Sequence, residues 1–203
     1  MTILNRALVF LIAGWSGFFV MAVELLSGRI LAPNFGNSIY VWGGVITIFM
    51  LALSIGYLIG GRLSLRGPSL GKLSIVLMVA AVSTTPVVLV SNAVLDRIFT
   101  LIEDPRYGSL ISATILFFLP TMLSGIVSPY AVRLLVTEFK QSGHVAGILY
   151  FVSTFGSAAG TILTSFYLVL YFEINHIFWV MIGVSLLLSI ISFFVGRKGV
   201  ENN

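Results

Sequence analysis

Long apolar stretches free of charged side chains alternate with short polar segments along the whole chain. Six such stretches occur, at residues 7–23, 39–61, 73–95, 108–132, 145–172 and 177–196. Each approaches or exceeds the roughly 20 residues that an α-helix needs to cross the hydrocarbon core of a bilayer. A transmembrane β-barrel would show shorter segments of alternating polarity instead. The pattern therefore predicts an all-α integral membrane protein with six transmembrane helices.

Composition supports the membrane class and argues against several functions. Hydrophobic residues make up 58% of the 203 residues and charged residues only 9%, far outside the range of soluble domains. The chain has no Cys and two His, so we expect no disulfide, metal site or cofactor. No paired carboxylates or Ser–His pair occur in any span, so we do not expect an enzyme.

The basic residues predict the orientation of the chain. With a cytoplasmic N-terminus, the inner side carries Arg6, Arg62, Arg66, Lys72, Arg133, Lys140, Arg197 and Lys198, and the outer side carries only Arg97 and Arg106. Positive charge collects in cytoplasmic loops, which accounts for the net charge of +4 without nucleic acid. We expect a multi-pass protein of the cytoplasmic membrane of a prokaryote, with both termini in the cytoplasm.

The two halves of the chain echo each other. Residues 25–33, which we expect to close the first helix, resemble residues 122–129 at an offset of 97, and Gly56 and Gly60 recur as Gly156 and Gly160 at an offset of 100. A unit of three spans re-enters the membrane from the opposite side, which gives an inverted three-plus-three repeat. We therefore expect one transmembrane domain over 1–203, with repeats at about 7–95 and 108–196.

Glu24 is the acidic residue that lies well inside a predicted span. An ionised carboxylate there costs several kcal/mol on insertion scales, so something must compensate it. One interpretation is a ligand- or proton-binding carboxylate that faces the bundle interior, together with Arg29. The other is a structural role, as a partner for Arg29 or for a backbone donor, although five residues on a regular helix place Glu24 and Arg29 about 140° apart.

Small and polar residues mark the fourth and fifth spans. Pro120, Gly125 and Pro129 predict a kinked or broken fourth helix. Its freed carbonyls could be satisfied by Thr121, Ser124 and Ser128, or the break could line a substrate site. The candidate ligand-binding set comprises Glu24, Arg29, Thr121, Ser124, Ser153 and Ser157. The spacing of four glycines indicates close helix packing, at Gly56, Gly60, Gly156 and Gly160. We interpret Trp42 as an interfacial aromatic residue.

Several of these positions resemble a known family. The residues are Glu24-Leu25-Leu26, Arg29, Leu31-Ala32-Pro33, Gly36, Ser38, Trp42, Gly56-Tyr57 and Gly60-Gly61-Arg62-Leu63, followed by Pro120-Thr121-Met122, Ser128-Pro129 and Leu149-Tyr150. They look like the membrane part of spermidine-synthase-like proteins, which fuse a major-facilitator-like bundle to an aminopropyltransferase-like domain. The resemblance implies half of a major-facilitator-like fold and a polyamine-related setting.

The loop at residues 60–72 is similar to the major facilitator signature between the second and third helices. This likeness assigns Arg62 and Arg66 to inner-loop gating, although Leu65 stands where an Asp usually precedes the basic residue. The family's soluble synthase-like domain is not part of the 203 residues, so the resemblance covers the membrane module alone.

Two functions follow as expectations. The first is a half-transporter for a small solute, an organic cation or polyamine, that forms a parallel homodimer with Gly156 and Gly160 as one candidate seam. The alternative is a non-transporting anchor or scaffold for a separate aminopropyltransferase-like protein. In that case the basic inner loops would bind the partner, or simply membrane lipid.

Overall fold

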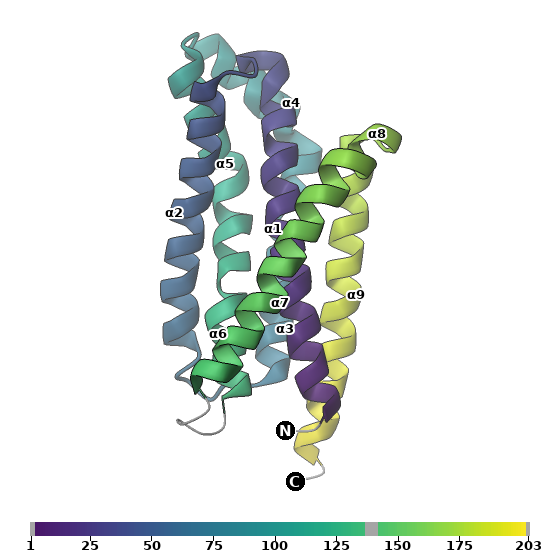
Figure 1. Ribbon diagram of the computed structural model, residues 1–203. Helices are drawn as coiled ribbons and strands as arrows, with labels where there is room; N and C mark the ends of the chain where they lie inside the picture. The colour runs from purple at the N-terminus through teal and green to yellow at the C-terminus, as the bar shows by residue number, and fades with distance from the viewer. Residues whose placement is uncertain (1–2, 137–141, 202–203) are drawn as a thin grey trace.

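The computed structural model describes residues 3–136 and 142–201, and every regular element in them is a helix. Six helical segments are long and apolar enough to cross a membrane, which confirms the predicted all-α, six-span class (Figure 1). The spans are α1 (Ile3–Phe35); α2 (Ile39–Leu63); α3 (Leu70–Ser83) with α4 (Thr85–Leu101); α5 (Pro105–Gly125) with α6 (Val127–Leu135); α7 (Ser142–Leu163), the π-helix η2 (Thr164–Leu168) and α8 (Val169–Tyr171); and α9 (Ile174–Glu201).

The first helix extends further than its apolar stretch predicts. It continues past Pro33 to Phe35, and the N–H of Gly36 then donates to the carbonyl of Ala32 at 2.9 Å. Gly36 has a φ of +78°, the left-handed conformation that commonly ends a helix at a glycine. Gly36, rather than Pro33, therefore ends α1.

The fourth span is broken, as its prolines predict. α5 ends at Gly125 and α6 begins at Val127, because Pro129 cannot donate to the carbonyl of Gly125. The hydroxyl of Ser124 donates to the carbonyl of Pro120 at 2.9 Å. That carbonyl is not one that Pro120 or Pro129 frees, so Ser124 does not have the compensating role that we expected.

Two further interruptions were not predicted. The third span breaks at Thr84, next to Pro86, and the Thr84 hydroxyl donates to the carbonyl of Ala80 at 3.0 Å. The fifth span widens into a π-helix at Thr164–Leu168, where no Pro occurs. In η2 the N–H of Val169 bonds to the carbonyl of Thr164, five residues earlier.

The spans pack in three principal pairs: α2 against α5, α1 against α7, and α3 against α9. Gly56 approaches the carbonyl of Met122, while Gly156 approaches the carbonyl of Gly14. A Cβ on Gly60 would lie 2.6 Å from the Ile126 carbonyl oxygen. These glycines therefore allow helix backbones to come into contact. Gly156 and Gly160 both pack against α1 of the same chain, where a Cβ on Gly160 would lie 2.5 Å from the Phe18 carbonyl oxygen. Gly156 and Gly160 therefore face α1 within the chain, and the dimer seam stays a prediction.

If each of the first three spans is matched with the corresponding span of the last three, α2 corresponds to α7 and α1 to α5. The pair α2–α5 then corresponds to the pair α7–α1. In these contacts Leu53 lies against Gly125 as Ser153 lies against Gly17, which relates Gly17 to Gly125 at an offset of 108. The sequence echo related Gly28 to Gly125 instead, at an offset of 97. Between the first and fourth spans the packing thus has a different register from the echo, whereas Leu53 and Ser153 keep the offset of 100 between the second and fifth spans. The inverted repeat stays a prediction.

Both ends of the chain lie at the same end of the bundle, where α1 begins and α9 finishes (Figure 1). Arg62 near the end of α2, Lys72 near the start of α3 and Arg133 near the end of α6 belong to this end too. Lys140 and the side chain of Lys198 lie outside the described part of the chain. Which side of the membrane this end faces stays a prediction.

Candidate functional site

A cavity of about 230 Å³ opens at the end of the bundle opposite the termini. Three elements meet there: the C-terminal part of α1, the start of α2 with the residues before it, and η2. The lining residues are Leu25, Gly28, Arg29, Ala32, Asn37, Trp42, Thr164, Ser165 and Val169. Sequence reasoning placed only Arg29 of this set in a candidate site.

Trp42 forms one wall because Gly28 has no side chain. A Cβ on Gly28 would lie 2.5 Å from Cη2 of Trp42, so any larger residue would push the indole away. The indole N–H of Trp42 donates to Oδ1 of Asn37 at 2.5 Å. Trp42 is therefore a structural part of the cavity, in addition to being near the end of a span.

Thr164 of the π-helix is one of the residues that line the cavity. The residue is fully buried, and its Oγ1 has no hydrogen-bond partner among the described residues. Thr161, one turn earlier, shows the usual alternative, since its hydroxyl donates to the carbonyl of Ser157 at 3.0 Å. π-Helical turns occur frequently at functional sites, and an unpaired buried hydroxyl costs free energy.

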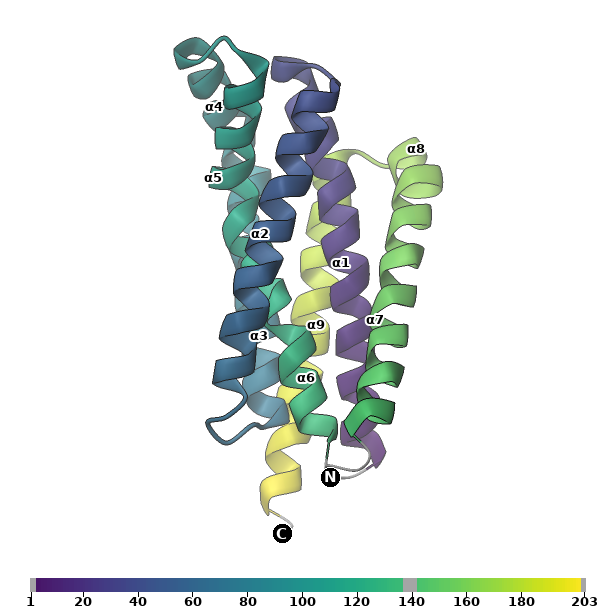
Figure 2. The ribbon, with the colours of Figure 1, turned by 60° about the vertical axis from the view of Figure 1, so that its left-hand side comes forward.

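Glu24 lies one helical turn below Gly28 and is half-buried. Gly17 faces α7 at Ser153, and Gly28 faces α2 at Trp42. Glu24 follows Gly17 by seven residues and precedes Gly28 by four, so it lies within about 40° of both on the helix surface. Its side chain therefore lies on the same face of α1 as these two glycines, and Figure 2 shows α1 between α2 and α7.

Glu24 and Arg29 do not form an ion pair. Within the described ranges, the ion pair that the structure shows is Asp104–Arg106, at 2.7 Å. Arg29 is exposed and lines the cavity, whereas Glu24 does not line it. The structure thus leaves an unpaired cation and an unpaired anion close together along α1.

The other predicted ligand-binding residues lie at helix contacts away from this cavity. Ser16 of α1 donates to the carbonyl of Ser124 at 3.3 Å, and the Ser157 hydroxyl donates to the carbonyl of Ser153 at 3.1 Å. Thr121 is buried in α5. The structure does not bring these residues together with Glu24 and Arg29 around one cavity.

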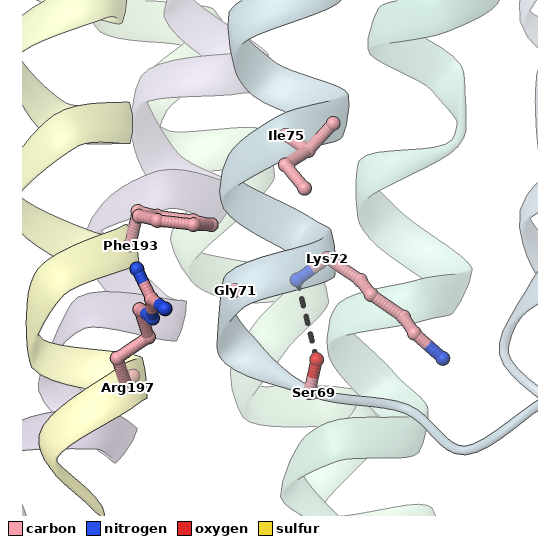
Figure 3. A pocket seen from close by; sticks show the side chains of 7 residues that line it. Ser69, Gly71, Lys72, Ile75, Phe193 and Arg197 are labelled. Atoms are coloured by element: carbon pink, nitrogen blue, oxygen red, sulfur yellow. Dashed lines mark hydrogen bonds between the residues drawn. The ribbon is translucent and has the colours of Figure 1, made fainter.

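At the end that carries the termini, a second cavity of about 340 Å³ lies between α3 and α9. Figure 3 shows Arg197 beside Phe193, with Lys72 turned away from both. The Lys72 ammonium donates to the carbonyls of Arg66 and Gly67 at 2.7 and 2.8 Å. Lys72 therefore holds the loop between α2 and α3.

The loop before α5 carries the one described acid with a clear electrostatic partner. Asp104 accepts from the backbone N–H of Arg106 at 2.9 Å and pairs with its guanidinium. These hydrogen bonds favour the ionised carboxylate and lower its pKa below the usual value. The Arg106 guanidinium also lies over the rings of Tyr40 and Tyr107, at 5.9 and 5.8 Å.

The six apolar helices define a multi-pass membrane protein. Comparison with protein families, curated proteins and solved structures finds no match for the chain.

Proposed function

We propose that this chain is half of a membrane transporter for a small cationic solute, in which Glu24 binds the solute or a coupled proton. The observation that carries the proposal is the position of Glu24. It is a half-buried carboxylate on the face of α1 that carries Gly17 and Gly28, and it has no ion-pair partner in the described part of the chain. Ionisable groups within membrane spans are costly, and they commonly mark substrate or proton pathways.

A cation matches the charge of this carboxylate. The resemblance of residues 24–33 and 56–63 to spermidine-synthase-like membrane modules favours an organic cation or polyamine. One carboxylate is few for a polycation. A parallel homodimer would contribute a second Glu24, and its seam would use outward surfaces of α2 and α7, since the glycines of α7 already contact α1.

Transport by the purified chain in proteoliposomes tests the proposal. We expect uptake of spermidine or putrescine but not of a neutral solute of similar size. Glu24→Gln keeps the size of the side chain and removes its charge, so we expect uptake to fall at least about tenfold. Glu173→Gln is the matched control, because Glu173 is an exposed acid in the turn between α8 and α9. Wild-type uptake by folded Glu24→Gln protein would show that the carboxylate is architectural.

The second candidate function is a scaffold for a separate aminopropyltransferase-like protein. Arg62 and Arg66 favour it, because both are exposed at the end that carries the termini. Neither guanidinium forms an ion pair within the described residues. Anionic lipid headgroups are the competing ligand. Loss of partner co-purification in a variant with Arg62→Gln and Arg66→Gln, with no effect on lipid binding, would support the scaffold.

A further inference from the structure

We propose that the cavity between α1, α2 and η2 binds a phosphate group, carried by a phospholipid headgroup or by a soluble phosphate ester. The proposal concerns binding alone and holds whether or not the chain transports a solute. It uses Arg29, Asn37 and Thr164, and it does not involve Glu24.

The lining of the cavity is rich in hydrogen-bond donors and has no acidic side chain. Arg29 supplies a guanidinium, whose planar fork suits phosphate oxygens. Asn37 already accepts from the indole of Trp42 through its Oδ1, so its amide N–H groups are the part of the side chain left to donate. An anion with several oxygens therefore complements this lining better than a cation does.

Thr164 provides an independent indication of a ligand. Thr164 lines the cavity, and its hydroxyl is buried and has no hydrogen-bond partner in the described structure. Threonine hydroxyls elsewhere in these helices donate to the carbonyl four residues earlier, as Thr47, Thr114 and Thr161 do. A phosphate oxygen would give the Thr164 hydroxyl the acceptor that its own helix does not give it.

The position of the cavity favours the phospholipid as the source of the phosphate. Arg29 precedes the end of α1 by six residues, about 9 Å along the helix axis, so it lies near the depth of lipid headgroups. A separate apolar cavity of about 450 Å³ lies between α1, the end of the fifth span and α9, and Leu168 lines it. Trp15, Phe18 and Phe172 also line the apolar cavity, which is suited to an acyl chain.

Native mass spectrometry of the full chain with added phosphatidylglycerol tests the proposal, with diacylglycerol as the lipid that lacks the phosphate. We expect wild-type protein to retain phosphatidylglycerol and not diacylglycerol. Arg29→Gln should weaken retention by about 10-fold to 100-fold, and Thr164→Val by about 10-fold, the usual range for hydrogen bonds to a charged group. The matched controls Arg97→Gln and Thr161→Val should retain the lipid as wild type does.

Competition distinguishes the two sources of the phosphate. Displacement of the lipid by glycerol 3-phosphate would show that soluble phosphate esters share the site, and resistance to displacement would show that the lipid is the ligand. Thr164→Val removes one hydroxyl at nearly constant volume, so we expect this variant to fold, and an unchanged melting temperature would verify that it does. The test therefore stays valid even if Arg29→Gln were unstable. Equal retention of phosphatidylglycerol by wild type, Arg29→Gln and Thr164→Val would overturn the proposal, as would equal retention of diacylglycerol.

Discussion

Replacing Gly156 with Ala should separate α7 from α1 and destabilise the bundle. Gly156 packs directly on the backbone of Gly14, where a Cβ would meet the carbonyl oxygen and lie 2.8 Å from the carbonyl carbon. Neither atom can turn aside, because both belong to the backbone of a helix. Gly147, on the same helix, has nothing within 4 Å of its Cβ position and provides the matched control.

The size of the effect follows from the contact distance. Carbon atoms pack best at about 3.5 Å or more, so the contact with the carbonyl carbon alone requires α7 to move by about 0.7 Å, and the closer carbonyl oxygen requires a larger movement. A gap of this size forfeits about a quarter to a half of each dispersion contact along the seam, and overpacking generally costs about 1–3 kcal/mol. The higher helix propensity of Ala returns up to about 1 kcal/mol, which Gly147→Ala gains without the clash. We expect the two variants to differ by about 2 kcal/mol.

Unfolding of the purified variants in detergent, followed by circular dichroism against added denaturant, measures this difference. Gly156→Ala should unfold at a lower midpoint than wild type, and Gly147→Ala at the same or a higher midpoint. If Gly156→Ala is as stable as wild type, the contact between the α1 and α7 backbones is not as close as the structure shows.

Four further outcomes are expected. In this Cys-free chain, an impermeant thiol reagent on intact cells should label Glu103→Cys and not Leu65→Cys; the reverse result would invert the predicted orientation. The pKa of Asp104 is lowered by its hydrogen bonds to Arg106, so its contribution to stability is present at neutral pH and is lost as pH falls through the folded-state value. Asp104→Asn should therefore flatten the acid limb of a plot of melting temperature against pH, and an unchanged limb would count against this role. Ser185→Ala should leave the Trp15 indole N–H, now bonded to Ser185 at 2.8 Å, without an acceptor and destabilise the protein by about 0.6–2 kcal/mol, and equal stability in denaturant titrations would mean that this bond is replaced. Native mass spectrometry should show a dimer, and a transporting monomer would refute the proposed dimer.

Local chemistry made several features readable from the sequence. Uninterrupted apolar length determined the six spans, because a bilayer leaves few alternatives to a helix. The break of the fourth span near Gly125 followed from Pro129, since a missing N–H acts on the residue four positions earlier whatever the surroundings. Glu24 was recognisable as a candidate for the same reason: the cost of a charge in a span depends on depth more than on neighbours.

Only the tertiary structure decided which surfaces meet. The spacing of Gly156 and Gly160 indicated a close approach but could not tell a partner chain from α1, because small residues serve both kinds of contact equally. The same ambiguity gave an offset of 97 between the first and fourth spans, where the contacts between helices follow 108. The donor-rich cavity was hidden for a related reason, since Gly28, Trp42 and Thr164 are far apart in sequence. Two features bring them together: a glycine that leaves room for an indole, and a π-helix that no proline in the sequence indicates. Both depend on packing between helices.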